Sequence, residues 1–441
     1  MASVPELSLP PVVQTARWIF RPTLLLDRAR EECGDVFRLR FFPGRALVLT
    51  SDPADVRRLF TAPPETVPTA TGNSPIAPLV GEHSLLTLNG PPHLRQRKLL
   101  LPSFHGDRMR AYAEIIEEAA NDRIDRWREG DVMRLQPHMS AITLEVILRA
   151  VFGVEDAARQ TELRTAIENL LLYTASPRAA ITAIRTLRTG ELVGPFARLA
   201  GEMDRLLYDE IAAHRQRGGL EEREDILSLM MCARDEDGES MTDVELRDEL
   251  VTLLLAGHET TATSLSWAFE RLLRTPHALA RLTDEIEDDA YLDAVIHETL
   301  RSRPVVPIIG REPQEPIAFG EYELPVGTFA GASLYGTNHN PAVYEDPKAF
   351  IPERFLDRKP DTYAWIPFGG GIRRCIGAAF AQMEMRLVLR AVLRRVRLEA
   401  VDPAPERIRR RNITFVPQHG TTVRVRTVDR APARPEAVAV S

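Results

Sequence analysis

The stretch WIPFGGGIRRCIG, residues 365–377, decides how this chain is interpreted. It places Cys375 directly after three glycines and two arginines. Glycines let a backbone approach a neighbouring group closely, and nearby cations favour the thiolate over the thiol. The stretch therefore indicates a loop that lies against something flat and holds a reactive sulfur, rather than a cysteine kept for packing.

The composition indicates one large globular unit. The chain has 441 residues, 44% of them hydrophobic, and no Ser/Gly-rich linker or repeat divides it. We expect a single domain over residues 1–441, with loosely ordered tails at 1–12 and 427–441. The net charge of −7, with basic residues spread along the chain, excludes a typical nucleic-acid-binding protein.

Cysteine and lysine usage indicate the cellular setting. Cys33, Cys232 and Cys375 form neither a disulfide framework nor a Cys-x-x-Cys metal site, which fits a reducing cytoplasm. Arginine greatly outnumbers lysine, as in GC-rich bacterial genomes. We expect no signal peptide and no membrane span, because no apolar run reaches about 18 residues.

Hydrophobic periodicity predicts a mainly α fold with small β-sheets. Strand-like segments are short and lie mostly toward the two ends of the chain, at residues 36–42, 46–50, 316–329, 412–417 and 421–428. The strongest helical patterns cover residues 107–129, 138–152, 159–173, 197–217, 243–274, 276–287, 290–301 and 377–394.

The helix predicted over 243–274 has an unusual middle. A capping box at Thr242–Glu245 opens it, and Pro276 follows its end. Its first half is apolar nearly all round, so it runs through the interior. The segment AGHETT, residues 256–261, then places polar groups and a glycine in that buried helix, which weakens it and indicates a functional role.

Four motifs, in their order along the chain, resemble those of the cytochrome P450 family. The resemblance covers about residues 34–425. The cysteine motif is Phe368-x-x-Gly371-x-Arg373-x-Cys375-x-Gly377, and the other three are AGHETT at 256–261, ETLR at 298–301 and FIPERF at 350–355. The resemblance implies a triangular helical prism, with haem b buried between the long central helix and the helix after the cysteine loop.

The resemblance assigns roles to the cysteine motif. Cys375 is expected to ligate haem iron as a thiolate, which favours O–O cleavage. Phe368 is expected to shield the sulfur, Gly371 to supply a tight turn and Gly377 to allow close packing on the porphyrin. Arg373 is expected to pair with a haem propionate.

Further cofactor contacts are expected from three side chains. His93 and Arg97 lie one helical turn apart and resemble a propionate-binding pair, and Arg311 is expected to add a third contact. Each of these alone is more often a solvated surface charge.

Glu259 and Thr260 resemble the acid–alcohol pair that delivers protons for O–O cleavage. Thr260 is expected to bond either to the carbonyl of Ala256 or to a water molecule, and in both cases to open a groove for dioxygen. His258 is expected to face another helix.

Glu298, Arg301 and Arg354 are expected to form a buried structural triad that holds the segment leading to Cys375. The alternative is an exposed salt bridge between helical neighbours.

The substrate contacts are the least specific part of the pattern. The candidates are mostly aliphatic, which favours a terpenoid, a steroid or a fatty acyl chain. The segments 71–88 and 170–190 are expected to form the loop over the haem and a mobile lid. Ordinary core packing is the alternative for each candidate wall residue: Val305, Val306, Ile308, Ile413 and Thr414.

We therefore predict a cytoplasmic, monomeric monooxygenase that uses O₂ and an apolar small molecule. Because little chain follows the haem region, electrons are expected from a separate ferredoxin or flavodoxin with its reductase. The alternatives are a peroxide-driven peroxygenase, which typically lacks the acid–alcohol pair, and a non-enzymatic haem sensor. The expected docking surface is a basic patch of Arg95, Lys98, Arg374, Arg386 and Arg390.

Overall fold

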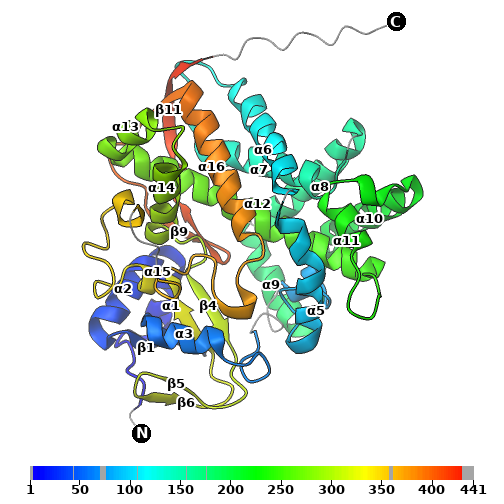
Figure 1. Cartoon of the computed structure of the whole chain (residues 1–441). Helices are drawn as coiled ribbons and strands as arrows, with labels where there is room; N and C mark the ends of the chain where they lie inside the picture. Colours follow the sequence, from blue (N-terminus) through cyan, green and yellow to red (C-terminus); the bar gives the residue numbers. More distant parts are fainter. Residues whose placement is uncertain are drawn as a thin grey trace, which may run out of the picture.

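Helices make up most of the molecule, and small sheets gather toward one side of it (Figure 1). The mainly α fold predicted from periodicity is therefore confirmed. None of the described helices is long and apolar enough to cross a bilayer. The computed structural model describes residues 3–42, 44–69, 76–106, 108–154, 156–174, 176–356 and 361–429.

Helix α12 (Asp243–Arg274) has the bounds that the sequence predicts. The Thr242 N–H donates to the Glu245 carboxylate at 2.7 Å, and the Glu245 N–H donates to the Thr242 hydroxyl at 3.2 Å. This capping box satisfies N–H groups that a helix start leaves unpaired. Pro276 begins the next helix and prevents α12 from continuing.

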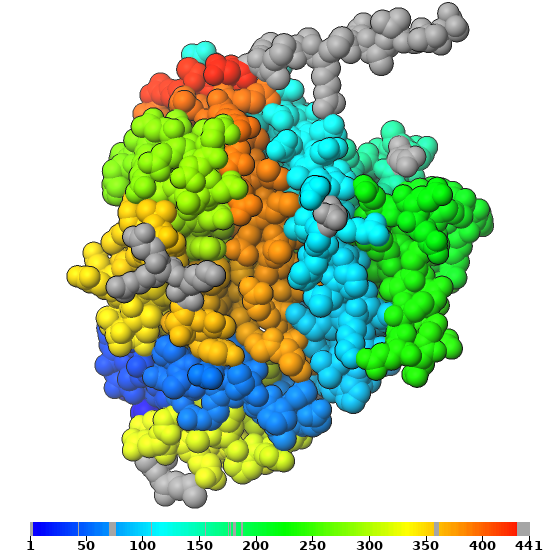
Figure 2. Space-filling view, in the orientation of Figure 1, coloured from blue at the N-terminus to red at the C-terminus, as the bar shows by residue number. Residues whose placement is uncertain are grey.

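Several helices pack around α12. Helix α12 packs most extensively against α7 and also contacts α10, α14 and α16. Helices α16 and α6 lie side by side (Figures 1 and 2). The helices are α1 (Pro11–Phe20), α2 (Pro22–Cys33), α3 (Pro53–Thr61), α4 (Ala77–Val80), α5 (Gly90–Leu100), α6 (Arg108–Ile124), α7 (Leu135–Ala150), α8 (Ala157–Thr174), α9 (Pro177–Thr189), α10 (Gly194–Arg217), α11 (Ile226–Cys232), α13 (Pro276–Asp284), α14 (Asp289–Ser302), α15 (Leu334–Asn338) and α16 (Ala378–Arg395).

The strands form four small sheets. The largest has the order β1-β2-β7-β4, and its β2–β7 pair is parallel, whereas its other two pairs are antiparallel. The others have the orders β3-β11-β8, β10-β9 and β5-β6. The strands are β1 (Val36–Phe41), β2 (Arg45–Thr50), β3 (Val132–Arg134), β4 (Ile308–Arg311), β5 (Ile317–Phe319), β6 (Tyr322–Leu324), β7 (Ala330–Ser333), β8 (Val396–Ala400), β9 (Ile408–Arg411), β10 (Thr414–Pro417) and β11 (Thr422–Val428).

Residues 3–12 do not form the loose tail that is expected over 1–12. From residue 3 on, the chain runs along strand β1: the Arg38 N–H donates to the Pro5 carbonyl at 2.9 Å, and Leu7 is buried. The expected tail at 427–441 is also too long, because β11 extends to Val428. Residues 430–441 lie outside the described part of the chain.

Candidate active site

The loop that carries Cys375 passes so close to Phe60 that only glycine fits at position 371. Gly371 has a φ of +63°, and an added Cβ would lie 1.9 Å from the Phe60 carbonyl oxygen. A single 3-10 turn (Gly371–Arg373) follows, and the Cys375 N–H then donates to the Phe368 carbonyl at 2.9 Å. The chain therefore makes a tight turn at Gly371 before it presents the thiol.

Cys375 is an exposed residue, yet many protein atoms lie around its thiol. Burial is the largest influence on the pKa of Cys375 and raises it. The Gly377 N–H and the charges of Arg97 and Arg374 act in the opposite direction and favour the thiolate. This combination fits a sulfur that faces an enclosed space rather than the outer surface.

Phe368 and Gly377 flank the cysteine in different surroundings. Phe368 packs into the main core and meets the Trp365 ring edge to face, with 6.1 Å between the ring centroids. At Gly377 an added Cβ would meet no described protein atom within 4 Å. Packing against the protein therefore does not account for the glycine at this position, whereas close approach of a bound group would.

Four basic side chains gather near this loop. His93 and Arg97 come from α5, Arg311 from β4 and Arg373 from the loop itself. Burial, followed by the charges of Arg373, Arg97 and Arg311, lowers the pKa of His93 to about 4. The pKa of Arg311 falls to about 10 through burial, and that of Arg373 falls to about 10 through burial and its arginine neighbours.

Among the described residues, none of these three arginines has a carboxylate partner. The Arg373 side chain donates to the Leu88 carbonyl and to the Asn89 side chain. His93 Nδ1 is buried and has no hydrogen-bond partner within the described part of the chain. Buried like charges without counter-ions destabilise a fold. The cluster is thus complementary to a buried dianion.

These observations test whether the residues fit haem b, and they do. The four basic side chains match the two propionates of haem, and the crowded Cys375 thiol matches a metal that would hold it as a thiolate. Arg97 also donates to the Arg374 carbonyl at 2.6 Å, which joins the basic cluster to the cysteine loop.

The middle of α12 is open, although most of the helix is buried. Ala256 is exposed and Thr260 is partly exposed, whereas Ala262 to Leu272 are buried. The Thr260 hydroxyl donates to the Ala256 carbonyl at 2.6 Å, which is one of the two arrangements expected from the sequence. His258 points to another helix, as predicted, with Nε2 3.0 Å from the Ser140 carbonyl in α7.

Glu259 has two partners that the sequence does not reveal. Arg411 Nε donates to its carboxylate at 2.8 Å, and the Thr414 hydroxyl donates to the same oxygen at 2.9 Å. Both partners lie in the β9–β10 hairpin, about 150 residues from Glu259 along the chain. Arg411 remains 32% exposed, so the acid is held at a position that reaches solvent.

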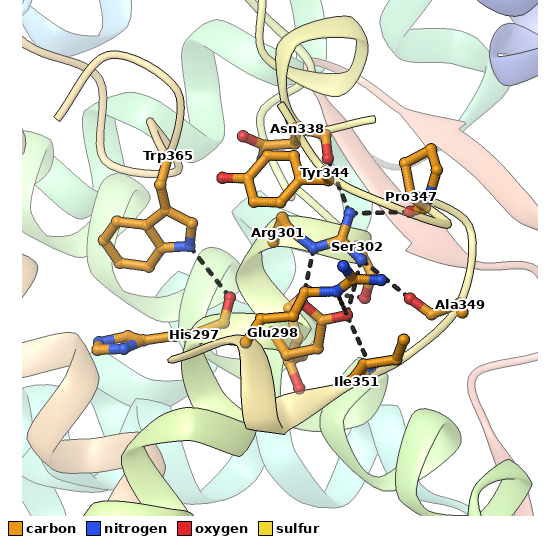
Figure 3. Close-up of polar contacts among 12 residues, drawn as sticks. His297, Glu298, Arg301, Ser302, Asn338, Tyr344, Pro347, Ala349, Ile351 and Trp365 are labelled. Carbon is orange, nitrogen blue, oxygen red and sulfur yellow. Dashed lines mark hydrogen bonds and ion pairs between the residues drawn. The ribbon is translucent and has the colours of Figure 1, made fainter. Parts of the chain in front are cut away.

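Arg301 and Glu298 lie fully buried in α14 and bind each other through two hydrogen bonds (Figure 3). The remaining Arg301 N–H groups donate to the carbonyls of Asn338, Pro347 and Ala349, at 2.8, 2.8 and 3.0 Å. All five guanidinium N–H groups are therefore used. Arg301 ties α14 to the segment that precedes the cysteine loop.

Arg354 makes the weakest contact with Glu298 in this group. Its Nε lies 3.7 Å from Glu298 Oε1, which is an ion-pair distance rather than a hydrogen bond, and this Nε has no hydrogen-bond partner among the described residues. Arg354 instead donates through Nη2 to the Asp346 carbonyl at 2.9 Å. The second strong contact of Glu298 is the Ile351 N–H at 2.8 Å (Figure 3).

The candidate substrate residues fall into different environments. Val305 is buried, Val306 and Ile308 are partly buried, and Ile413 is 68% exposed at the tip of the β9–β10 hairpin. Thr414 is buried against Glu259, so its hydroxyl serves that acid. Residues 71–75, at the start of the expected loop over the haem, lie outside the described part of the chain, as does residue 175 in the expected lid.

Four of the five residues in the basic patch expected behind the cysteine have carboxylate partners. Arg95 pairs with Asp235 and Glu245, Lys98 with Glu236, Arg386 with Asp293 and Arg390 with Asp289. These acids come from other elements, which the linear pattern of arginines does not reveal. Arg374 alone has no carboxylate partner among the described residues.

Glu249, a buried acid in α12, anchors the segment before α5. Glu249 is fully buried, and its carboxylate accepts the Leu85 N–H at 2.8 Å. One turn later, Thr252 bonds the Ser84 hydroxyl at 2.6 Å. Burial is the main cause that raises the pKa of Glu249 from 4.5 to about 8, and the negative charges of Asp248 and Glu245 add to it.

Stability should therefore depend on the protonation of Glu249. Because its folded pKa is raised, the wild type should lose stability relative to Glu249→Gln as the pH rises from about 5 through about 8, by roughly 2–4 kcal/mol. Above about pH 9 the difference should level off. Urea unfolding of both proteins across this range measures it, and a difference that does not vary with pH would show that Glu249 stays ionised in the fold.

Comparisons with known proteins all match this chain to cytochromes P450. The family model described as Cytochrome P450 matches residues 9–423. "Putative cytochrome P450 137" of Mycobacterium tuberculosis is 40% identical over 383 residues, which cover 86% of this chain and 80% of that protein. "Putative cytochrome P450 135B1" of Mycobacterium bovis is 38% identical, over 100% of this chain and 96% of that protein.

Solved structures agree on the fold. A cyanobacterial CYP120A1, described as bound to retinoic acid, superposes with a TM-score of 0.81 at 23% identity and covers 96% of this chain and 99% of its own. The haem domain of cytochrome P450DA also gives a TM-score of 0.81, at 25% identity, covering 97% of this chain and 98% of its own.

Proposed function

This chain belongs to the cytochrome P450 family, and from that premise we propose that it inserts one atom of O₂ into an apolar small molecule with electrons from a separate ferredoxin or flavodoxin. As a P450 it is a haem-thiolate monooxygenase with haem b as its cofactor. We propose its substrate class, its reductant and the role of each residue.

The observation that carries the proposal is the grouping of an accessible cysteine with four basic side chains that have no acidic partner among the described residues. Cys375 would bind the haem iron, and His93, Arg97, Arg311 and Arg373 would bind the propionates. When bound, the haem would supply the activation of O₂. The protein would orient the cofactor through the basic cluster and tune the sulfur through the Gly377 N–H.

Glu259 and Thr260 would move protons. The Thr260 hydroxyl lies in the open middle of α12, and the carboxylate of the neighbouring residue Glu259 is 20% exposed. Arg411 and Thr414 hold this carboxylate in the structure. In the proposed relay the carboxylate would leave these partners, turn toward Thr260 and then return. An alcohol beside the reacting oxygen and a carboxylate that reaches solvent make a short proton relay.

The substrate is proposed to be a terpenoid, a steroid or a fatty acyl chain. Support comes from the aliphatic side chains Val305, Val306, Ile308 and Ile413 on the segments expected to line the pocket. We further propose a cytoplasmic monomer, which fits the unpaired cysteines Cys33 and Cys232. Since most of the expected basic patch is already paired with acids, Arg374 is the residue we would first test in reductant binding.

Thr260→Ala should uncouple electron use from product formation. Alanine keeps α12 helical, so substrate binding and reduction should be nearly unchanged, while loss of the hydroxyl should disturb proton delivery. We expect product formed per reducing equivalent to fall roughly tenfold, with hydrogen peroxide rising to match. The measurement uses a compound that shifts the Soret band and a surrogate ferredoxin with its reductase.

Ser264→Ala is the matched control, because Ser264 makes the same kind of helical bond, to the Thr260 carbonyl at 2.9 Å, one turn further along. It should keep wild-type coupling. An unchanged product ratio in Thr260→Ala would mean that this hydroxyl only packs the helix. Efficient turnover by the wild type with peroxide, but not with the ferredoxin pair, would instead favour a peroxygenase.

A further inference from the structure

The outward face of α1 is apolar, which is the reverse of an ordinary surface helix. Its inner face holds Gln14, which is fully buried, donates to the Leu9 carbonyl at 2.7 Å and accepts the Arg40 N–H at 2.9 Å. The outward positions are apolar: Val12, Val13, Ala16, Ile19 and Phe20 are all exposed, Val12 and Phe20 by 62% and 72%. A helix on a globular surface normally turns its polar side to water.

Two neighbouring elements extend this apolar surface. Phe42, after β1, is 66% exposed, and its N–H donates to the Thr15 hydroxyl of α1 at 2.9 Å. Leu24, in the first turn of α2, is 55% exposed. We call this surface the α1 face, and it consists of Val12, Val13, Ala16, Ile19, Phe20, Leu24 and Phe42.

The clustering sets the α1 face apart from the rest of the surface. Of the 18 large hydrophobic side chains that are exposed in the described residues, six lie on it. Helix α3, by contrast, exposes Arg57, Arg58 and Thr61. Single exposed apolar side chains are common, whereas a contiguous group marks an interaction surface.

The charges beside the α1 face indicate what it binds. Helix α1 contains no acidic residue, and Arg17 and Arg21 at its end have no carboxylate partner among the described residues. The surface hollow that these two arginines line also contains acids, but Asp27 pairs with Lys348 and Glu32 with Arg28, which leaves Glu31. Unpaired arginines beside exposed apolar side chains are typical of helices that lie in the interface of an anionic bilayer.

We propose that the α1 face docks on the surface of a lipid bilayer with anionic headgroups. Phe20, Ile19 and Phe42 insert at the boundary between headgroups and acyl chains, and Arg17 and Arg21 bind lipid phosphates. This attachment is peripheral and reversible, since one short helix and one hairpin tip supply the inserted groups. It goes beyond the proposed function and depends on none of the haem-site residues.

Co-sedimentation of the full-length, haem-loaded protein with vesicles tests the proposal. The wild type should pellet with phosphatidylcholine vesicles that contain phosphatidylglycerol, and less with phosphatidylcholine alone or at raised salt. Ile19→Ser combined with Phe20→Ser should lower the partition coefficient at least about tenfold. The matched control is Leu172→Ser, which removes a side chain that is 70% exposed on α8, and it should bind as the wild type does.

The charge part has its own variant. Arg17→Gln combined with Arg21→Gln should remove the preference for phosphatidylglycerol and leave the weaker binding to phosphatidylcholine. An unchanged preference would contradict the role of the arginines. Absence of wild-type binding, equal binding by the Ile19/Phe20 variant, or a wild-type dimer in sedimentation velocity that this variant dissociates would each overturn lipid docking. Unchanged Soret spectra and melting temperatures establish that the variants are folded.

Discussion

Arg301→Ala should yield a protein that fails to retain haem and unfolds at a much lower temperature than the wild type. The substitution leaves the fully buried Glu298 without its partner and frees three carbonyls in the segment 338–349. Breaking a buried ion pair costs about 3–5 kcal/mol, a large part of the roughly 5–15 kcal/mol that holds a typical domain. Haem content per chain and the melting temperature measure the effect.

Two further variants test whether the loss of haem comes from the buried hydrogen bonds of Arg301. Arg301→Lys keeps the charge but cannot reproduce five donors in a planar fork, so it should also lose haem. Arg386→Ala removes another α14 partner, the Asp293 pair at 2.7 Å, but this pair is partly exposed and should cost about 1 kcal/mol or less. Wild-type haem content and melting temperature in Arg301→Ala would contradict a structural role for this group.

Strong local signals explain where the sequence predicts the fold well. The bounds of α12 are correct because a capping box and a proline mark its two ends. The predicted helix 377–394 lies within one residue of α16. Strands β4 and β7 were not predicted, because each has only four residues and is defined by its pairing partners. The parallel pairing of β2 with β7 joins segments about 280 residues apart, and no local pattern carries that information.

In the candidate site, too, the sequence predicts features that are marked locally and misses contacts between distant segments. The resemblance supplies the positions of Cys375, Thr260 and Arg301, because the motifs are compact in sequence. It does not supply partners that are backbone carbonyls, such as those of Arg301, or partners from distant segments, such as Arg411 beside Glu259. The linear pattern likewise does not show the acids that pair with four residues of the expected basic patch, because these acids lie on other elements.

Replacing Cys375 should abolish the haem-thiolate site and all monooxygenase turnover. A thiolate is the ligand that gives this class of haem its oxygen chemistry, and alanine has no atom that can bind iron. Cys375→His should still bind haem through an imidazole but lose turnover, which separates the ligand's chemistry from haem retention. Cys33→Ala and Cys232→Ala are matched controls, since both cysteines are partly buried and should leave activity unchanged.

The most direct measurement is the absorption spectrum of the reduced protein with carbon monoxide. The wild type, Cys33→Ala and Cys232→Ala should show the Soret band at the position typical of thiolate ligation. Cys375→Ala should lack this band, and Cys375→His should show the band typical of an imidazole ligand. A thiolate-type band that survives in either Cys375 variant would contradict the assignment of Cys375 as the haem ligand.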